Sequence, residues 1–402
     1  MPERSTRILA ATAPLILAGI VLVAATMRGP FTSVGPLLEQ IRSELDMSAA
    51  AAGVLTMLPL LAFAVVSPLA PGFGRRLGLE WAIGSALVVL AGGIVLRSVP
   101  GHPALFAGTA LIGVAIGLVN VLLSGLIKRD HPNHAAALTG LYTTVMGGFA
   151  MLGSGIAVPV AQAAPGGWRT SLGLWVVVAV AALIAWIPRL RGHAAPTGDG
   201  PHATDRAHWR SPLAWQLTAF MGLQSLGFYV AVSWLPSILH TNGISPESAG
   251  WYLALMQLTG LIASAASPAI VRRLPDQRLF TAGAALLGVL SYLGFVLAPG
   301  LSPLWSATVG LSQGVGITLA LSFFALRARD ANQAAALSGM GQSLGYGLAA
   351  LGPLLFGLLH DRTGGWTVPL VILAGLITVQ AVVALGAGRA IRVGDPVPAR
   401  RR

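Results

Sequence analysis

The chain has 402 residues, of which 55% are hydrophobic and only 9% are charged, and its mean hydropathy is +0.76. A soluble protein would carry roughly a quarter charged residues, so the composition excludes an ordinary soluble domain and indicates a polytopic membrane protein. The net charge of +12 lies mostly in short loops, as expected beside an anionic leaflet, and predicts no nucleic-acid partner. The absence of cysteine excludes disulfides and thiol chemistry.

Apolar runs of about 20 residues, the length that a helix needs to cross a hydrocarbon core, follow one another along the chain. The first run is too long for a signal peptide, and we expect it to be retained. The twelve predicted spans cover 8–38, 48–70, 79–97, 103–127, 135–162, 170–188, 212–240, 247–270, 279–298, 303–326, 333–359 and 366–387.

The distribution of basic residues predicts the orientation of the chain. Lys and Arg in short loops favour the cytoplasmic side, and most of the 25 basic residues fall on the side of the N-terminus. Both termini are therefore predicted to lie in the cytoplasm, in a bacterial-type inner membrane. Arg42, Arg97, Arg169 and Arg362 fall on the outer side, which leaves Arg28 as the only basic residue predicted within a span.

The two halves of the sequence repeat one another. The segment "SPLA" at 67–70 returns as "SPAI" at 267–270, and "KRDHPNHAAALTG" at 128–140 returns as "ARDANQAAALSG" at 328–339. Each half holds six predicted helices, an even number, so both halves have one orientation and are related by an axis along the membrane normal. The cleft between the halves is the natural place for a substrate.

The repeat predicts the domain organisation. We expect an N-terminal six-helix bundle over 1–188, a cytoplasmic linker over 189–211 and a C-terminal six-helix bundle over 212–402. The fold class is then an all-α membrane protein with twelve transmembrane helices. Nothing in the sequence indicates a cofactor or a metal, and we expect a monomer.

The chain resembles the major facilitator superfamily over its whole length, in its six plus six helices, its basic central segment and its Arg-rich loops. The segment "MRGPFTSVGPLLEQIRSELDMS" from Met27 to Ser48 is similar to the first-helix signature of the bacterial cyanate and nitroimidazole permease group. The resemblance implies transport by alternating access of two bundles. One departure is "PGFGRRLG", which places Pro71 and Arg75 where the superfamily's loop motif usually has Gly and Asp.

The repeated loops supply a candidate inner gate. Asp130 and Asp330 follow repeated arginines at the cytoplasmic ends of the fourth and tenth spans. We expect them to bridge the arginines of the other repeated loops when the inside is closed; alternatively, these arginines only set the topology. The arginines concerned are Arg75, Arg76, Arg272 and Arg273.

Arg28 lies near the middle of the first predicted span, although an arginine at a helix centre costs about 2.5–3.5 kcal/mol. Every Asp and Glu falls in a loop or at a span end, so the sequence places no carboxylate at this depth. Water, polar side chains or an anionic substrate could compensate the charge, and a guanidinium matches a carboxylate-like anion in a fork geometry. In the alternative reading, Arg28 snorkels to an interface or bonds carbonyls freed by Gly29-Pro30.

Other polar residues near the middle of predicted spans are candidate substrate contacts or ordinary interhelical hydrogen bonders. The seventh span is the symmetry partner of the first, so we expect Gln224 and Tyr229 to face Arg28 across the cleft. Phe31 and Thr32 would shape the rim. The remaining candidates are Asn120, Tyr142, Gln257, Gln313, Gln342 and Tyr346.

The sequence holds no His-Glu-x-x-His cluster, no paired membrane Asp and no nucleotide-binding loop, so it predicts neither an enzyme nor an ATP-driven pump. A receptor is disfavoured because the loops are too short for a signalling domain. We expect a secondary transporter of a small anionic solute, cyanate-like or a small carboxylate; the alternative is an exporter of drugs or small neutral heterocycles such as nitroimidazoles. Proton coupling would need the substrate itself or a span-end group such as Glu39; exchange and facilitated transport stay open.

Overall fold

The structure, a computed structural model, describes residues 18–130, 134–190, 209–329 and 331–393, and every regular element in that part of the chain is a helix. A first helix covers 18–26. The elements that follow are α2 Gly29–Thr32, α3 Val34–Glu44, α4 Ala49–Val66, α5 Ala70–Leu77, α6 Leu79–Ser98, α7 His102–Asp130, α8 Ala135–Ala163, α9 Gly167–Gly173, α10 Trp175–Leu190, α11 Pro212–Thr241, α12 Pro246–Val271, α13 Arg278–Leu297, η3 Pro299–Leu301, α14 Ser302–Leu326, α15 Ala331–Thr363 and α16 Thr367–Ala387.

The helices are long and apolar enough to cross a membrane many times. Within the described residues, 11 spans meet that standard, and a bent pair, Ala18–Thr32 and Val34–Glu44 with 42° between them, makes a twelfth. This agrees with the twelve spans predicted from the sequence. The bent pair corresponds to the first predicted span, and its bend lies at Ser33, while a separate interruption of the helix lies at Met27 and Arg28.

The chain groups into two compact units. Unit 1 comprises Met1–Gly198 and Val232–Ala254, and unit 2 comprises Asp199–Ala231 and Leu255–Arg402. The last part of α11 and the first part of α12 therefore belong to unit 1. The bundle limits that the repeat suggests, 1–188 and 212–402, stay a prediction.

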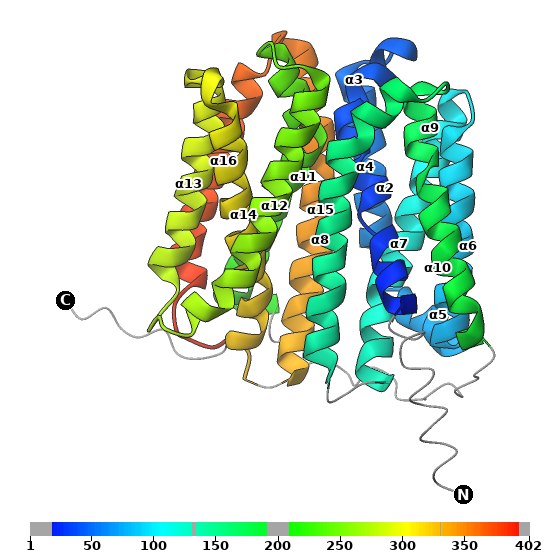
Figure 1. The fold of residues 1–402 in the computed structure, drawn as a ribbon. Helices are drawn as coiled ribbons and strands as arrows, with labels where there is room; N and C mark the ends of the chain where they lie inside the picture. Colours follow the sequence, from blue (N-terminus) through cyan, green and yellow to red (C-terminus); the bar gives the residue numbers. More distant parts are fainter. Residues whose placement is uncertain (1–17, 131–133, 191–208, 330, 394–402) are drawn as a thin grey trace, which may run out of the picture. The chain divides into compact units, whose positions relative to one another are not determined.

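In unit 1, α6 packs along α7, while α4 packs against α7 and α10 against α6 (Figure 1). The interior between these helices is apolar, and Trp186 of α10 lies fully buried in it. The indole Nε1 of Trp186 donates a hydrogen bond to the carbonyl of Glu80 at 2.9 Å. The one polar atom of the indole ring is therefore hydrogen-bonded to the start of α6, so the whole side chain can be buried without an unsatisfied donor.

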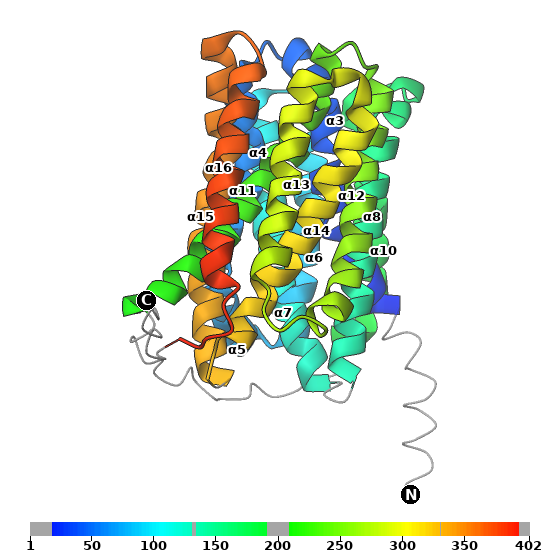
Figure 2. The ribbon, with the colours of Figure 1, turned by 90° about the vertical axis from the view of Figure 1, so that its left-hand side faces the viewer.

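In unit 2, α13 packs against both α14 and α16 (Figure 2). Glycines let α14 approach α12 closely: a Cβ atom at Gly310 would lie 2.1 Å from the carbonyl oxygen of Met256, and one at Gly314 would lie 2.1 Å from that of Gly260. Small residues at such positions are typical of membrane helix interfaces, where close packing replaces the hydrophobic effect.

The second predicted span, 48–70, is shorter in the structure than expected. Helix α4 ends at Val66, and a separate short helix, α5, begins at Ala70 with Pro71 in its first turn. Proline is well placed there because its missing N–H has no helical acceptor in the first turn. Arg75 and Arg76 therefore lie in the last turn of a short helix and not in a loop, and both are exposed.

Candidate functional site

The first span is broken at Arg28. The helix over 18–26 ends before it, Arg28 is the N-cap of α2 with φ −120° and ψ −39°, and its side chain is half-buried. Its carbonyl accepts hydrogen bonds from the backbone N–H groups of Phe31 at 3.1 Å and Thr32 at 2.9 Å. Pro30 sits at the start of α2, where a proline is tolerated. The structure thus places Arg28 at an irregular point of a membrane-spanning segment, as only a buried or wetted site permits.

Helix α8 supports the broken segment through hydrogen bonds. Thr32 donates its hydroxyl to the carbonyl of Ala150 at 2.9 Å, and Ser154 donates to the carbonyl of Thr32 at 3.3 Å. Pro36 has no N–H, so the Thr32 carbonyl four residues earlier lacks its helical donor. The Ser154 hydroxyl supplies a donor in its place. Thr32 is fully buried, and its position is set by these two contacts.

Arg97, which the sequence places on the outer side at the end of the span 79–97, is buried in the structure. It lies in the last turn of α6, is only 1% exposed, and donates from Nη1 to the carbonyl of Pro30 at 2.8 Å and from Nη2 to that of Leu172 at 3.5 Å. Arg28 is therefore not the only basic residue within a span. The second guanidinium is bonded to the broken segment that carries the first.

A signal for Arg97 was present in the sequence. The large buried side chains along one face of α6 include Ile83, Leu87, Leu90, Ile94 and Arg97. Their spacing alternates between four and three residues, which is the period of one helix face. Arg97 therefore continues the buried face, whereas a count of charged residues per loop assigns it to the exterior.

A small cavity lies beside the Arg97 guanidinium. Its volume of about 10 Å³ is at the lower limit for one water molecule. The Nε atom of Arg97 is buried and has no hydrogen-bond partner among the described residues. The cavity is lined by Phe31, Val34, Leu55, Thr56, Pro59, Arg97, Thr109 and Ile112.

In unit 2, two of the predicted site residues bond to each other. Gln224 of α11 donates from Nε2 to the backbone carbonyl of Gln313 at 2.9 Å and to its Oε1 at 3.0 Å. Gln313 in turn donates to the hydroxyl of Tyr292 at 3.5 Å, and that hydroxyl donates to the carbonyl of Gly227 at 3.1 Å. All three side chains are buried. The prediction from sequence missed Tyr292, which joins α13 to this network.

The other candidates of unit 2 occupy different surroundings. The rings of Tyr229 and Tyr346 meet edge to face with centroids 6.4 Å apart. Tyr229 and Gln257 are buried. Gln342 is half-buried, and its amide donates to the hydroxyl of Ser338 at 2.7 Å within the same helix. The structure therefore brings together Gln224 with Gln313 and Tyr229 with Tyr346.

Two candidates of unit 1, Asn120 and Tyr142, form no hydrogen bond with the described residues of the broken segment. Asn120 of α7 is exposed. Tyr142 of α8 is 8% exposed and lies in the apolar cluster of unit 1, where burial suits a structural role as well as a binding one. Phe31, by contrast, lies in the broken segment itself and lines the cavity beside Arg97.

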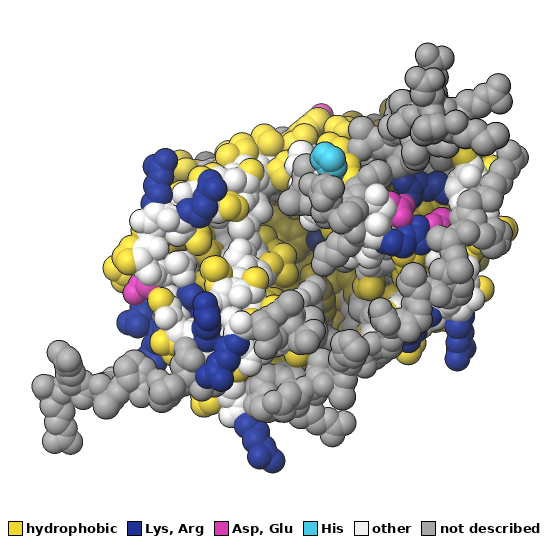
Figure 3. Space-filling view, turned by 90° about the horizontal axis from the view of Figure 1, so that it is seen from below, with side chains coloured by type: hydrophobic (Ala, Val, Ile, Leu, Met, Phe, Trp, Pro, Cys, Tyr) yellow, Lys and Arg dark blue, Asp and Glu magenta, His cyan; other side chains and the backbone are white. Residues whose placement is uncertain are grey.

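Asp130, one of the three gate candidates of unit 1, forms ion pairs at the end where α5 lies. Arg129 donates from Nε to Asp130 Oδ1 at 2.7 Å and also pairs with Glu80, and Arg189 Nη1 lies 3.5 Å from Asp130 Oδ2. Burial lowers the pKa of Arg129, but the bonds to Glu80 and Asp130 raise it more, so it stays above its ordinary value. Figure 3 shows acidic and basic side chains in contact on this face.

The remaining gate candidates show no such pairing. Among the described residues, Arg75, Arg76, Arg272 and Arg273 form no ion pair. Asp330 lies outside the described residues. In this structure Asp130 is thus bound by Arg129 and Arg189, and its pairing with the repeated arginines stays a prediction about the closed state.

Comparison with known proteins agrees with these observations. The chain is 45% identical over 377 residues to the "uncharacterized transporter YycB" of Bacillus subtilis (strain 168), covering 93% of each chain. It is 44% identical over 378 residues to the 2-nitroimidazole transporter of Escherichia coli (strain K12), covering 93% of this chain and 95% of the relative. It is 29% identical over 356 residues to the cyanate transport protein CynX of the same strain, covering 86% and 90%.

Solved structures share the fold at low sequence identity. A nucleoside transporter, NupG, superposes with a TM-score of 0.77 at 13% identity and covers 93% of this chain and 100% of its own. A D-xylose–proton symporter gives a TM-score of 0.73 at 14% identity, with 92% and 96% covered. The family model described as Major Facilitator Superfamily matches residues 17–350. The all-α fold of twelve transmembrane helices is confirmed, and the chain belongs to the major facilitator superfamily, whose members are transporters and not enzymes.

Proposed function

We propose that this chain is a secondary transporter of a small anionic solute, cyanate-like or a small carboxylate, with Arg28 as the fixed counter-charge. The single observation that carries the proposal is a half-buried guanidinium at the break of a membrane-spanning helix. Ionisable groups within a membrane are costly and mark substrate pathways. A guanidinium offers a planar fork of donors that matches a delocalised anion.

In the alternative, Arg28 only caps its own broken helix, and the donors of the nearby carbonyls bear on that reading. The carbonyl of Gly29 accepts from the Ser33 hydroxyl at 2.9 Å, and that of Pro30 accepts from Arg97. The carbonyl of Thr32 accepts from Ser154. These three carbonyls therefore have donors other than Arg28. The carbonyl that Pro30 deprives of its helical donor is that of Thr26, four residues earlier, so a capping role of Arg28 stays the alternative to the counter-charge.

A second candidate function is export of small neutral heterocycles. It is favoured by the 44% identity to a 2-nitroimidazole transporter, against 29% to a cyanate transport protein. In this case the Arg28 fork donates to the oxygens of a nitro group. Both solutes are small, planar and rich in acceptor atoms, so one donor fork serves either.

The working cycle that we propose is alternating access in a bacterial cytoplasmic membrane, with both termini in the cytoplasm and the protein acting as a monomer. The two predicted bundles, 1–188 and 212–402, rock about a central site. Arg28 faces Gln224 and Tyr229 across it, and Asp130 and Asp330 close the inner gate. Proton coupling, where it occurs, uses the solute or Glu39, which lies within α3 rather than beyond the span.

Transport by the purified full-length protein in liposomes tests the proposal. We expect flux of cyanate or a small carboxylate, driven by its gradient, and loss of most of that flux in Arg28→Gln. Flux of neutral 2-nitroimidazole without anion flux would select the second candidate. Binding of both solutes without any flux would instead indicate a receptor and would contradict both proposals.

A further inference from the structure

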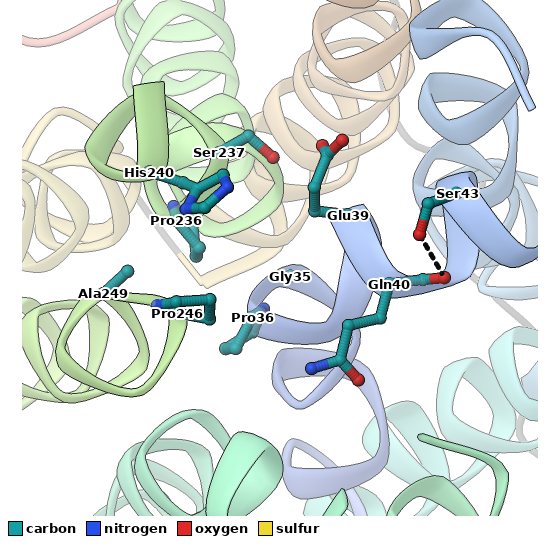
Figure 4. A pocket seen from close by; sticks show the side chains of 10 residues that line it. All are labelled: Gly35, Pro36, Glu39, Gln40, Ser43, Pro236, Ser237, His240, Pro246 and Ala249. Atoms are coloured by element: carbon teal, nitrogen blue, oxygen red, sulfur yellow. Dashed lines mark hydrogen bonds between the residues drawn. The ribbon is translucent and has the colours of Figure 1, made fainter. Parts of the chain in front are cut away.

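A pocket lies in unit 1 where α3 meets the end of α11 and the start of α12 (Figure 4). Its volume of about 160 Å³ is far above the roughly 10–15 Å³ that one water molecule needs. Arg28 does not line it, so this pocket differs from the proposed central site. The lining residues are Gly35, Pro36, Glu39, Gln40, Ser43, Pro236, Ser237, His240, Pro246 and Ala249.

Ser237 supplies the first indication that the pocket holds a ligand. The residue is 5% exposed, and its hydroxyl is buried without a hydrogen-bond partner among the described residues. Buried polar groups in folded proteins are nearly always bonded. Figure 4 shows this hydroxyl on the side of the pocket where the Glu39 carboxylate lies. Because Ser237 also lines the pocket, a rotation of its side chain about χ1 would offer this hydroxyl to a molecule bound there.

Two further polar side chains, Glu39 and His240, line the pocket. One carboxylate oxygen of Glu39 pairs with Arg42 Nη1 at 3.1 Å, and the carboxylate keeps acceptor capacity beyond that bond. The Nδ1 atom of His240 lies 3.4 Å from the carbonyl oxygen of Ile244. A carbonyl only accepts, so in this contact the His240 ring is the donor.

The other side of the pocket is apolar and is formed mainly by three prolines. Pro36 of α3, Pro236 of α11 and Pro246 of α12 line it together with Ala249. Proline rings are apolar and rigid, so they offer contact surface without the entropy cost of ordering a flexible side chain. A polar side and an apolar side in one small volume suit a flat ring that has polar atoms along one edge.

We propose that this pocket is a second solute site, which binds a small planar nitrogen heterocycle in its neutral, N–H-bearing form. The ring N–H donates to Glu39, the ring acceptor atom receives the Ser237 hydroxyl, and the ring faces pack against the prolines. The proposal rests on the proposed function in small-solute transport. It assigns the pocket a preference opposite to that of Arg28, because an anion here meets the Glu39 carboxylate.

The test measures binding of 2-nitroimidazole to the purified full-length protein by calorimetry. Ser237→Ala should weaken binding roughly three- to tenfold, as expected for loss of one hydrogen bond. It should not lower the melting temperature of the free protein, because the hydroxyl has no bond to lose. Ser233→Ala is the matched control, since Ser233 is also a buried and unbonded hydroxyl of α11 but does not line the pocket.

Glu39→Gln tests the charge and the N–H together. We expect it to weaken the binding of 2-nitroimidazole by about tenfold or more. The affinity for the N-methylated derivative, which has no N–H to donate, should stay unchanged. Glu247→Gln, an exposed acid of the same region that does not line the pocket, should have no effect. These results would support the proposal.

The pocket proposal and the proposed function fail in distinguishable ways. If wild-type protein does not bind 2-nitroimidazole, or if Ser237→Ala and Glu39→Gln bind it as wild type does, the second site is overturned, whatever Arg28→Gln does to flux. If Arg28→Gln retains full flux of every solute while the two pocket variants lose binding, the central counter-charge is overturned and the second site stands.

Discussion

The Arg97 guanidinium donates a 2.8 Å hydrogen bond to the carbonyl of Pro30, and so ties the end of α6 to the broken helix two residues after Arg28. A charged donor on a backbone carbonyl is worth about 1.5–3 kcal/mol, and here it is fully buried. The contact therefore fixes the position of the segment that presents Arg28. Arg97 acts on the site through the backbone.

Arg97→Lys should preserve the charge and lose the fork, so that only one of the two carbonyls keeps a donor. We expect the KM for the transported solute to rise by roughly one decade and the melting temperature to fall. The transport assay and thermal unfolding of the same preparation measure the two effects. Arg169→Lys is the control, because Arg169 pairs with Glu44 at a more exposed position. Wild-type KM in Arg97→Lys would show that the Pro30 contact does not position Arg28.

Gly29 is required by the packing of Trp175. A Cβ atom at Gly29 would lie 2.1 Å from the Trp175 ring, far inside van der Waals contact. The ring is itself buried and meets Phe149 edge to face at 6.3 Å, so it has little freedom to move. Gly29→Ala should destabilise the protein by about 1–3 kcal/mol, as overpacking does.

A substitution of Trp175, the residue that packs on Gly29, supplies the control. Trp175→Phe shortens the ring and should recover part of the stability lost in Gly29→Ala, although alone it leaves a cavity and is destabilising. Thermal unfolding of both single variants and the double variant gives the coupling energy. Additive losses would mean that the clash is relieved elsewhere.

The helices could be predicted well from the sequence because the length of an apolar run is directly the length of a membrane span. The repeat of the two halves was recognised from short motifs that occur in both. It predicted less of the site, because burial depends on which face a residue occupies. Arg97 was assigned to the exterior from its position in a count, although it continues the buried face of α6. Gln224 and Gln313 were found as polar residues, but their mutual bond depends on how α11 packs against α14, which no local pattern encodes.

At the end of unit 1 where α5 lies, Asp130 forms ion pairs with Arg129 and Arg189. Arg129 also pairs with Glu80. Asp130→Asn should release Arg189 and weaken the hold on Arg129, with a loss of about 1 kcal/mol because the network is partly exposed. We expect the variant to expose this end more often during the cycle.

Cysteine accessibility measures that exposure. The natural chain has no cysteine, so a single Cys introduced at Ser124, one turn and a half inside α7, reports on this end alone. We expect faster labelling in Asp130→Asn than in the parent Cys variant. The rate should be unchanged in the control Asp276→Asn of unit 2, where Asp276 pairs with Arg278 at 3.6 Å. Equal labelling in all three would exclude a gating role for Asp130.

Arg28 gives the decisive test of substrate charge. Because hydrogen bonds of charged groups contribute about 1.5–3 kcal/mol against about 1 for neutral pairs, Arg28→Gln should weaken an anionic ligand by roughly one to two decades. Arg28→Lys should be only partly tolerated, since the charge stays but the fork is lost. The affinity for a neutral nitro-heterocycle should fall less in Arg28→Gln, because the glutamine amide can still donate a hydrogen bond. Val88→Ala, at an exposed position of α6, should be silent. Unchanged affinity for the transported solute in folded Arg28→Gln would make the charge structural.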